Sequence, residues 1–157
     1  MGLRNIVEKG DPALRKTARE ITDVNDHIRQ ILDDLADTMY EADGVGLAAP
    51  QVGILRRMCV VDIGDRLYEL VNPRIVESEG DQYGEEGCLS VPGYSGSVHR
   101  PMKVKVWALD RNGNPAEYSA EGLLARAFCH EIDHLDGVLY IDKADNVHRN
   151  GEDPEEE

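Results

Sequence analysis

Two histidines separated by three residues, His130 and His134, enclose a glutamate in the run HEIDH. On a helix, side chains four residues apart lie on the same face, so both imidazoles can reach one metal ion. Glu131 lies beside that face, where it can contact a metal-bound water without ligating the ion. Zinc peptidases use this HExxH spacing, and the sequence therefore predicts a metal centre at residues 130–134.

A catalytic metal also needs a third protein ligand and one open coordination position. One class of metalloprotease continues as HExxHxxGxxH, and here Gly137 matches the glycine but Tyr140 stands in place of the third histidine. His148 is another candidate, although it lies in a polar segment close to the acidic end. We favour Cys88, in the run EEGCLSVPG, because a thiolate next to Gly87 can approach an ion closely.

The chain has 157 residues, which suits one domain, and its formal net charge is −14. A nucleic-acid-binding surface needs clustered lysine and arginine, and no such stripe occurs, so direct nucleic-acid binding is disfavoured. No apolar run approaches the roughly 20 residues of a membrane helix, and the amino terminus does not resemble a signal peptide. We expect one catalytic domain over residues 1–148 and a solvated, disordered acidic tail over residues 149–157.

The chain has three cysteines, Cys59, Cys88 and Cys129. An odd number does not suit a secreted disulfide scaffold, so a reducing compartment with free or metal-bound thiols fits better. Cys59, within the run MCVVDI, is expected to be a core residue of a strand.

Apolar residues at three- and four-residue steps predict a helix over residues 25–44, with Asn25 as its N-cap and Gly44 as its stop. Residues 44–53 are rich in glycine and small side chains, which favours a shaped loop. The stripe of the helix is expected to pack in the core and consists of Ile28, Ile31, Leu32, Leu35 and Met39.

Alternating patterns predict strands over residues 56–64, 67–80, 99–110 and 116–121, with a hairpin turn at residues 111–115. Ser119 is expected to cap a second helix, which begins near Ala120 and ends at Gly137. The strands and helices are segregated along the chain, so the fold class is α+β. We expect small antiparallel or mixed sheets packed around a central helix that carries HExxH, preceded by an amino-terminal helix.

Three segments occur in a fixed order: GVGLAAPQ at residues 44–51, EGCLS at residues 86–90 and HEIDH at residues 130–134. Together they resemble peptide deformylase, and the opening IVEKGDPALRK is similar to that family's amino terminus. The likeness extends from about Leu3 to Lys143. One HExxH motif alone is weakly specific, whereas three motifs in the correct order are strongly specific.

The resemblance implies a hydrolase that removes the formyl group from N-formylmethionyl peptides and releases formate. Cys88, His130 and His134 would hold one divalent ion, Fe²⁺ in many family members, with Zn²⁺, Ni²⁺ or Co²⁺ as alternatives. The substrates are new polypeptides, which implies transient proximity to ribosomes. We expect a monomer in the bacterial cytoplasm, with no membrane partner.

The resemblance also implies catalytic roles for three further residues. Glu131 would take a proton from water and later give it to the leaving amine, while Gln51 and the backbone N–H of Leu89 would meet the developing oxyanion. Gly44 and Gly46 would allow an extended peptide to pair with the loop. The pocket for the methionine side chain is expected to be lined by Val45, Leu123 and Ala127.

The chain differs from many family members at two places. Cys129 stands where glutamine often precedes the first histidine, and GYSGSVHR replaces a run that carries an arginine near the peptide groove. We expect the second difference to affect peptide affinity and sequence preference rather than the chemistry. Glu86 and Asp133 are family-like and are expected to orient the metal ligands.

Two other functions use the same residues. The first is an HExxH peptidase, which Tyr140 and the lack of a secretion signal disfavour. The second is a zinc-binding module without activity, in which one more side chain would close the coordination sphere, leaving Glu131 and Gln51 without a task. Formate release, cleavage of an unformylated peptide, or zinc binding without turnover distinguishes the three.

Overall fold

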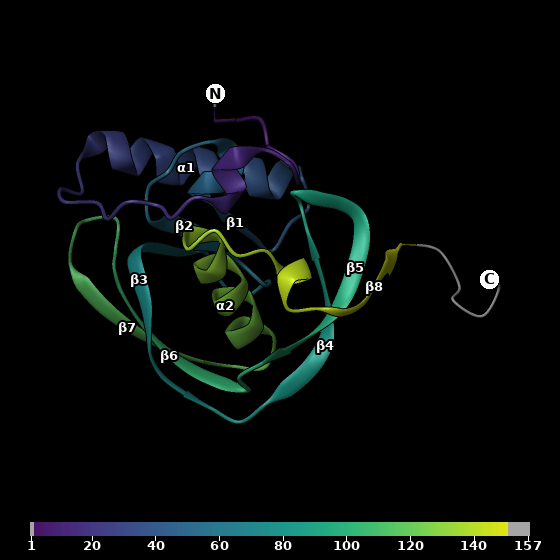
Figure 1. The fold of residues 1–157 in the computed structure, drawn as a ribbon. Coiled ribbons are helices and arrows are strands. Elements are labelled where there is room, and N and C mark those ends of the chain that lie inside the picture. Colours follow the sequence, from purple (N-terminus) through teal and green to yellow (C-terminus); the bar gives the residue numbers. More distant parts are fainter. Residues whose placement is uncertain (1, 151–157) are drawn as a thin grey trace.

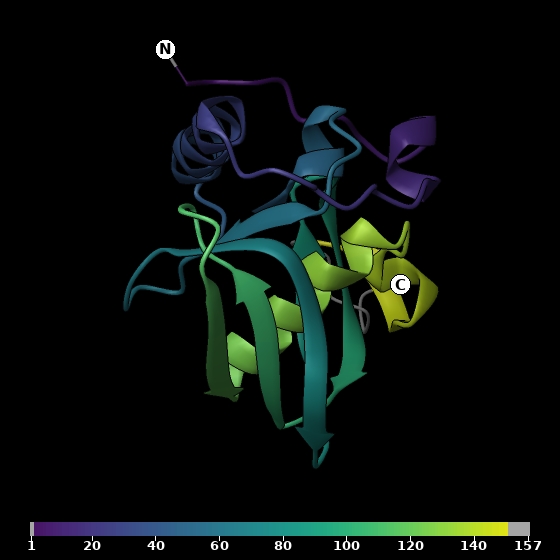
Figure 2. The same ribbon diagram turned by 90° about the vertical axis from the view of Figure 1, so that its left-hand side faces the viewer.

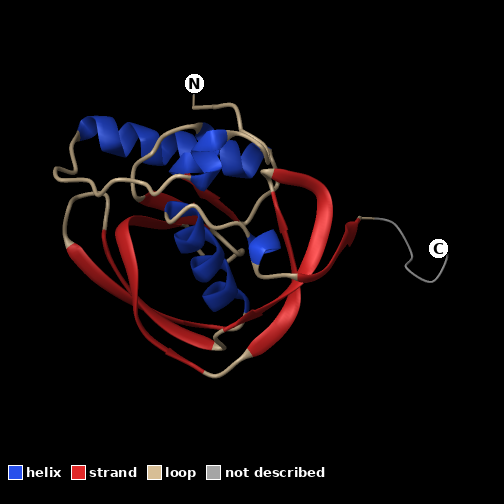
Figure 3. Ribbon diagram, in the orientation of Figure 1, coloured by secondary structure: helices blue, strands red, loops and turns tan. Residues whose placement is uncertain are grey.

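The computed structural model describes residues 2–150, and Figures 1 and 3 show the arrangement of its helices and strands. Two α-helices and eight strands make up most of these residues, joined by short 3-10 turns. None of the helices in this part of the chain is both long and apolar enough to cross a membrane. The class is α+β, as the sequence predicts.

Helix α1, Asp26–Glu41, follows the predicted cap closely. The Asn25 side chain accepts a hydrogen bond of 3.0 Å from the backbone N–H of Ile28. The helix ends before the predicted stop at Gly44, because Asp43 takes a left-handed backbone conformation with φ of 58°. Its buried stripe contains all five predicted residues: Ile28, Ile31, Leu32, Leu35 and Met39.

Five strands form one antiparallel sheet in the order β1-β2-β3-β6-β7. The predicted strands correspond to four of them, and Cys59 is buried in β2 as expected. The prediction of a loop at residues 44–53 is wrong in part, because this segment contains β1 and the 3-10 turn η2. The strands are β1 Gly46–Ala48, β2 Met58–Val61, β3 Tyr68–Glu79, β6 Lys103–Leu109 and β7 Pro115–Glu121, and η2 is Ala49–Val52.

A second antiparallel sheet contains β4 Gln82–Cys88, β5 Val91–Arg100 and β8 Asp145–Arg149, in that spatial order. Cys88 is the last residue of β4, at the tight connection to β5, where it pairs with Val91. Arg149, which the sequence places in the tail, pairs with Tyr94 as the last residue of β8. The rest of the predicted tail, from residue 151, lies outside the described residues.

Helix α2, Leu123–Leu135, lies among the strands of both sheets, as Figures 1 and 2 show from two directions. Its predicted start is wrong: Ser119 and Ala120 belong to β7, and the helix begins after Gly122 without a side-chain cap. Gly122 has φ of 63°, which lets the chain leave the strand and turn directly into the helix.

The apolar core has two main parts. One part lies between α1 and the sheet and includes Leu35 and Met58, while the other surrounds α2 and includes Phe128 and Leu70. The 3-10 turns η1, Pro12–Arg15, and η3, Tyr140–Asp142, cover the carboxyl end of α2. Because α2 is enclosed on most sides, its polar side chains must find partners inside the protein.

Candidate metal centre and active site

Three potential ligand atoms meet between β4 and α2. The donor atoms of Cys88, His130 and His134 all lie within 4.8 Å of one another. The Cys88 sulfur is 3.3 Å from Nε2 of His134, and the two imidazole rings are 5.0 Å apart, one helical turn along α2. One thiolate and two imidazoles are a donor set that suits Zn²⁺ and other divalent transition metals.

His148 does not join this group. Its Nε2 lies 3.0 Å from a carboxylate oxygen of Glu85, on the sheet formed by β4, β5 and β8. The sequence left this histidine open as an alternative third ligand. Of the two candidates, the structure brings only Cys88 to the histidine pair.

A buried carboxylate orients His130. Oε1 of Glu86 is 2.8 Å from Nδ1 of His130, so the imidazole donates its proton there and keeps Nε2 free for an ion. Burial alone would raise the pKa of Glu86, but hydrogen bonds from Arg100 and His130 lower it to about 2. Glu86 is therefore a carboxylate at neutral pH, as its predicted supporting role requires.

Two buried arginines hold this carboxylate. Arg100 donates two hydrogen bonds of 2.9 Å to Glu86, and Arg126 donates one of 2.7 Å. Arg100 also donates a hydrogen bond of 2.6 Å to Asp133, the other predicted supporting residue. Sequence reasoning missed both arginines, because each lies far from Glu86 in the chain and neither belongs to a recognisable motif.

Glu131 lies next to the ligands in a dry environment. Its side chain is buried, one oxygen lies 3.9 Å from Nε2 of His130, and the other has no hydrogen-bond partner among residues 2–150. Burial raises the pKa of this carboxyl to about 7. A carboxyl group whose pKa is close to neutral pH and which lies beside a metal site is suited to accept and return a proton.

Gly46 explains how Glu131 fits. A β-carbon added at this glycine would lie 2.8 Å from Cδ of Glu131. Real β-carbons do not approach other atoms so closely, so any larger residue at position 46 would displace the carboxylate. A similar contact exists at Gly44, where an added β-carbon would lie 2.7 Å from the Leu89 side chain.

The side-chain amide of Gln51 is fixed by hydrogen bonds at both ends. Its oxygen accepts a hydrogen bond of 3.0 Å from the backbone N–H of Ala48. This leaves the NH₂ group facing the site, where it lies 3.1 Å from the Ser90 hydroxyl and 3.5 Å from the Cys88 sulfur. The amide is a buried hydrogen-bond donor directed toward the ligands.

Two further buried polar atoms lack partners among the described residues, Nδ1 of His134 and the hydroxyl of Tyr140. The Tyr140 ring is nearly parallel to the His130 ring, with 6.0 Å between centroids and 24° between planes. Burial, followed by the charges of Cys88 and Glu86, raises the pKa of Tyr140 to about 12.

A cavity of about 440 Å³ opens beside the ligands. Val45 and Leu123 are half exposed and line it, as does the buried Ala127. All the residues that the sequence assigns to substrate binding therefore line one cavity: Gly44, Val45, Gly46, Leu123 and Ala127.

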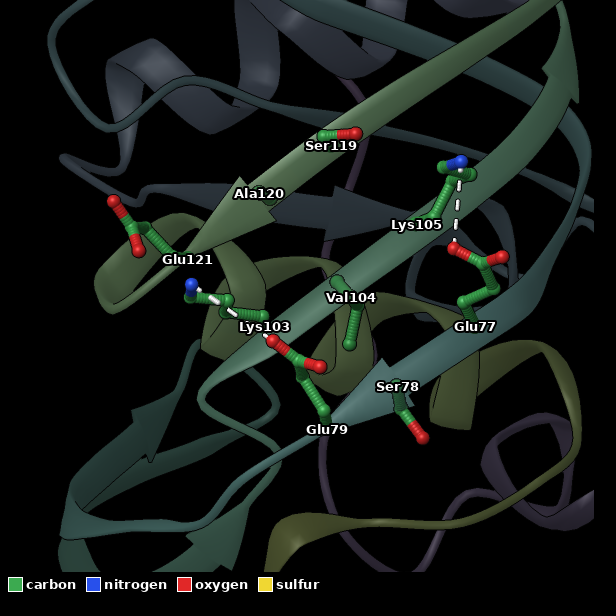
Figure 4. Close-up of a pocket in the computed structure, with 9 residues that line it drawn as sticks. All are labelled: Glu77, Ser78, Glu79, Lys103, Val104, Lys105, Ser119, Ala120 and Glu121. Atoms are coloured by element: carbon green, nitrogen blue, oxygen red, sulfur yellow. Dashed lines mark ion pairs between the residues drawn. The ribbon is translucent and has the colours of Figure 1, made fainter.

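A larger cavity of about 630 Å³ lies on strands β3, β6 and β7, away from these residues (Figure 4). It is lined by ion pairs between Glu77 and Lys105 at 3.3 Å and between Glu79 and Lys103 at 3.8 Å. It shares no lining residue with the cavity beside the ligands. Its lining contains no histidine or cysteine, so we assign the chemistry to the smaller cavity.

The sequence profile of the polypeptide deformylase family matches residues 3–150. The chain belongs to the peptide deformylase family. A peptide deformylase of Caldanaerobacter subterraneus is 62% identical over 143 residues, which cover 91% of this chain and 90% of the relative. A relative from Acetivibrio thermocellus with the same name is 54% identical and covers 91% of this chain and 84% of its own length.

Solved peptide deformylase structures share the fold. The enzyme of Legionella pneumophila has a TM-score of 0.88 at 46% identity, covering 92% of this chain and 87% of its own. The enzyme of Thermotoga maritima has a TM-score of 0.90 at 40% identity, and the match covers 92% of this chain and 99% of that one. The family predicted from three motifs is thus confirmed. This deformylase is a metal-dependent enzyme that removes the N-formyl group from nascent peptides.

Proposed function

We propose that Cys88, His130 and His134 are the metal ligands of this deformylase and that Fe²⁺ is the native ion, with Zn²⁺, Ni²⁺ and Co²⁺ as substitutes. The observation that carries the proposal is the convergence of the three donor atoms within 4.8 Å, one from Cys88 at the end of β4 and two from α2, the helix that bears HExxH. The carboxylate of Glu86 supports it further, because it fixes the tautomer of His130. When bound, the ion acidifies water and polarises the formyl carbonyl.

Glu131 is the proposed proton carrier. Its carboxylate takes a proton from the attacking water and hands it to the amine that leaves when the formyl C–N bond breaks. The dry setting supports this role, since burial raises the pKa of the carboxyl toward neutrality and Gly46 leaves it room.

The NH₂ group of Gln51 and the backbone N–H of Leu89 are the proposed donors to the oxyanion. The Gln51 amide is held in place by Ala48 and Ser90, so little reorganisation is needed during the reaction. Removal of one such donor typically lowers kcat by about 10²–10³-fold. We therefore expect Gln51→Ala to lower kcat by a factor in that range while the protein keeps its metal.

The peptide is proposed to bind as an added strand along residues 44–46. Within residues 2–150, strand β1 is at the edge of its sheet and pairs with β2 alone, which leaves its other side available to an extended chain. Val45, Leu123 and Ala127 then receive the methionine side chain, because they supply the apolar wall of the cavity.

At the level of the whole chain, we propose a monomeric catalytic domain that includes Arg149 at the end of β8 and works in the bacterial cytoplasm close to ribosomes. The nascent-chain substrate supports the location, because formylated chains are present where translation begins. We further propose that the iron form loses activity in air faster than the nickel form, since a ferrous thiolate site is open to oxidation. Equal decay of the two forms would contradict this.

The deciding experiment compares wild type with Glu131→Gln, each loaded with Ni²⁺ to equal metal content. Wild type is expected to release formate from formyl-Met-Ala-Ser. The rate of release should be about 10²–10⁴-fold lower in the variant. Full deformylation by the metal-loaded variant would remove Glu131 from the mechanism. Metal analysis after anaerobic purification of wild type tests the identity of the native ion.

A further inference from the structure

Tyr140 stands at the position where one class of peptidase has its third metal-binding histidine, yet the steps above give it no task. We propose that the Tyr140 hydroxyl positions the Cys88 thiolate, by donating a hydrogen bond that reaches the sulfur through one internal water. The inference rests on the metal site proposed above and adds a residue that touches the ligands rather than the substrate.

The burial of the hydroxyl is the first observation. The Tyr140 side chain is only 1% exposed, and its hydroxyl has no hydrogen-bond partner among residues 2–150. An unpaired buried hydroxyl costs about 1–3 kcal/mol, whereas a phenylalanine at this position would avoid that cost. A tyrosine is therefore explained best if the hydroxyl has a partner that forms in the working protein.

The position of the ring is the second observation. Tyr140 stacks on the His130 ring from η3, and it shares a small buried cluster with Val91 and Val98, against which Cys88 packs. The ring thus lies beside His130 and in the same cluster as Cys88, two of the three proposed ligands. Neither contact involves the cavity that receives the peptide, because Tyr140 does not line it.

The chemistry of the neighbours selects the acceptor. A tyrosine hydroxyl keeps its proton at neutral pH, so it can donate to an anion. Glu86 already accepts hydrogen bonds from Arg100, Arg126 and His130. The neighbours of the Cys88 sulfur include the Gln51 amide and the imidazoles of His130 and His134, and the two imidazoles would turn to the ion once it binds. A thiolate has room for another donor, and an internal water can bridge two polar groups at little cost.

Such a hydrogen bond withdraws charge from the sulfur. Hydrogen bonds to metal-bound thiolates are one means by which proteins tune the electronic properties of the ion. Tyr140 is therefore a positioning residue whose effect should appear in the spectrum of the metal–thiolate bond. A merely structural aromatic ring would leave that spectrum unchanged.

The test uses the full chain loaded with Co²⁺, whose thiolate-to-cobalt charge-transfer band reports the charge on the sulfur. Tyr140→Phe is expected to move this band to lower energy, because the sulfur regains electron density. The unfolding equilibrium constant of the variant should rise by about 2- to 13-fold, corresponding to one lost hydrogen bond.

Tyr68→Phe is the matched control. Tyr68 is also a buried tyrosine, but its hydroxyl donates a hydrogen bond of 2.9 Å to Asp65, which is not one of the proposed ligands. This variant should also be somewhat less stable, yet its band should stay at the wild-type energy. An unmoved band in Tyr140→Phe, or greater stability of that variant than of wild type, would overturn the inference.

A second measurement applies if Tyr140→Phe does not fold. Replacing every tyrosine by 3-fluorotyrosine makes each hydroxyl a stronger donor, and the band should then move to higher energy, in wild type and in Tyr68→Phe alike. No movement would overturn the inference. Wild type that folds but binds no Co²⁺ would refute the metal site itself, which separates the two failures.

Discussion

Helices α1 and α2 show two different relations between sequence and environment. In α1, six of the eight buried residues are apolar, the other two being Asp34 and Thr38, while side chains such as Asp26 and Glu41 lie in solvent. In α2, ten of the thirteen residues are buried, and four of those ten are polar: Arg126, His130, Glu131 and His134. The comparison shows that α1 contributes stability through apolar packing, whereas α2 depends on charges supplied by distant strands.

The largest effect should come from breaking the partner network of α2. Glu86→Gln leaves Arg100 and Arg126 buried without their shared carboxylate, and removal of one partner from a buried ion pair typically costs about 3–5 kcal/mol. Urea unfolding measures the loss, and titration with Ni²⁺ should show affinity weakened by about 10–100-fold. Asp26→Asn in α1 is the control: it removes only an exposed ion pair with Arg29, so it should change the stability slightly and the affinity not at all.

The same carboxylate predicts a pH dependence for the metal-free protein. Because its folded pKa is about 2, below its ordinary value of 4.5, Glu86 contributes stability that is fully present above pH 4.5. That contribution is lost as the pH falls from 4.5 through about 2. Wild type should therefore lose stability more steeply than Glu86→Gln over this interval, and parallel curves would show that the group is not held as described.

Leu35→Ala makes the opposite perturbation in α1. Leu35 is completely buried under the helix, so its truncation should lower the free energy of unfolding by about 2–5 kcal/mol. At temperatures where the variant is folded, its Ni²⁺ affinity and its rate of deformylation per folded molecule should equal those of wild type. A lower activity per folded molecule would mean that α1 does more than provide packing.

Gly46→Ala should separate activity from stability near α2. The added methyl group overlaps the Glu131 carboxylate, and a displacement of about 1 Å at a reacting group can lower the rate by about 10²-fold. The Ni²⁺ content of Gly46→Ala should equal that of wild type, because the glycine contacts Glu131 and none of the proposed ligands. Formate release equal to that of wild type would contradict the close fit.

The smallest effect should come from the cap of α1. Asn25→Ala removes the hydrogen bond to the Ile28 N–H and should cost about 0.5–2 kcal/mol in thermal or urea unfolding. Metal affinity should not change. Asn25→Asp is the control, because aspartate retains a side-chain acceptor and should restore wild-type stability.

These two helices also show how far the sequence can be interpreted. The cap and stripe of α1 are local signals, and the structure agrees with both. The predicted start of α2 at Ser119 is wrong, because β7 continues to Glu121. The chain then turns abruptly at Gly122, where no capping side chain marks the start of the helix. Short-range periodicity could not reveal that strand pairing would prevail over capping.

The candidate site was predictable where a motif carries the chemistry. Cys88, His130 and Glu131 were identified from their types and order, and the structure brings them together. Arg100 and Arg126 were not, because they meet Glu86 only after β5 and α2 fold against β4. No local sequence pattern identifies the distant partner of a buried charged side chain.

Cys88 and His134 are 46 residues apart in the chain, on two elements that no disulfide joins. An ion held between them, as proposed, would link β4 to α2 only while the fold is intact. By mass action, an ion at 100 times its dissociation constant adds about 2.7 kcal/mol to the stability. Depletion of metal in the cell would therefore lower the stability of this deformylase as well as its activity, and the less stable protein would be more susceptible to proteolysis.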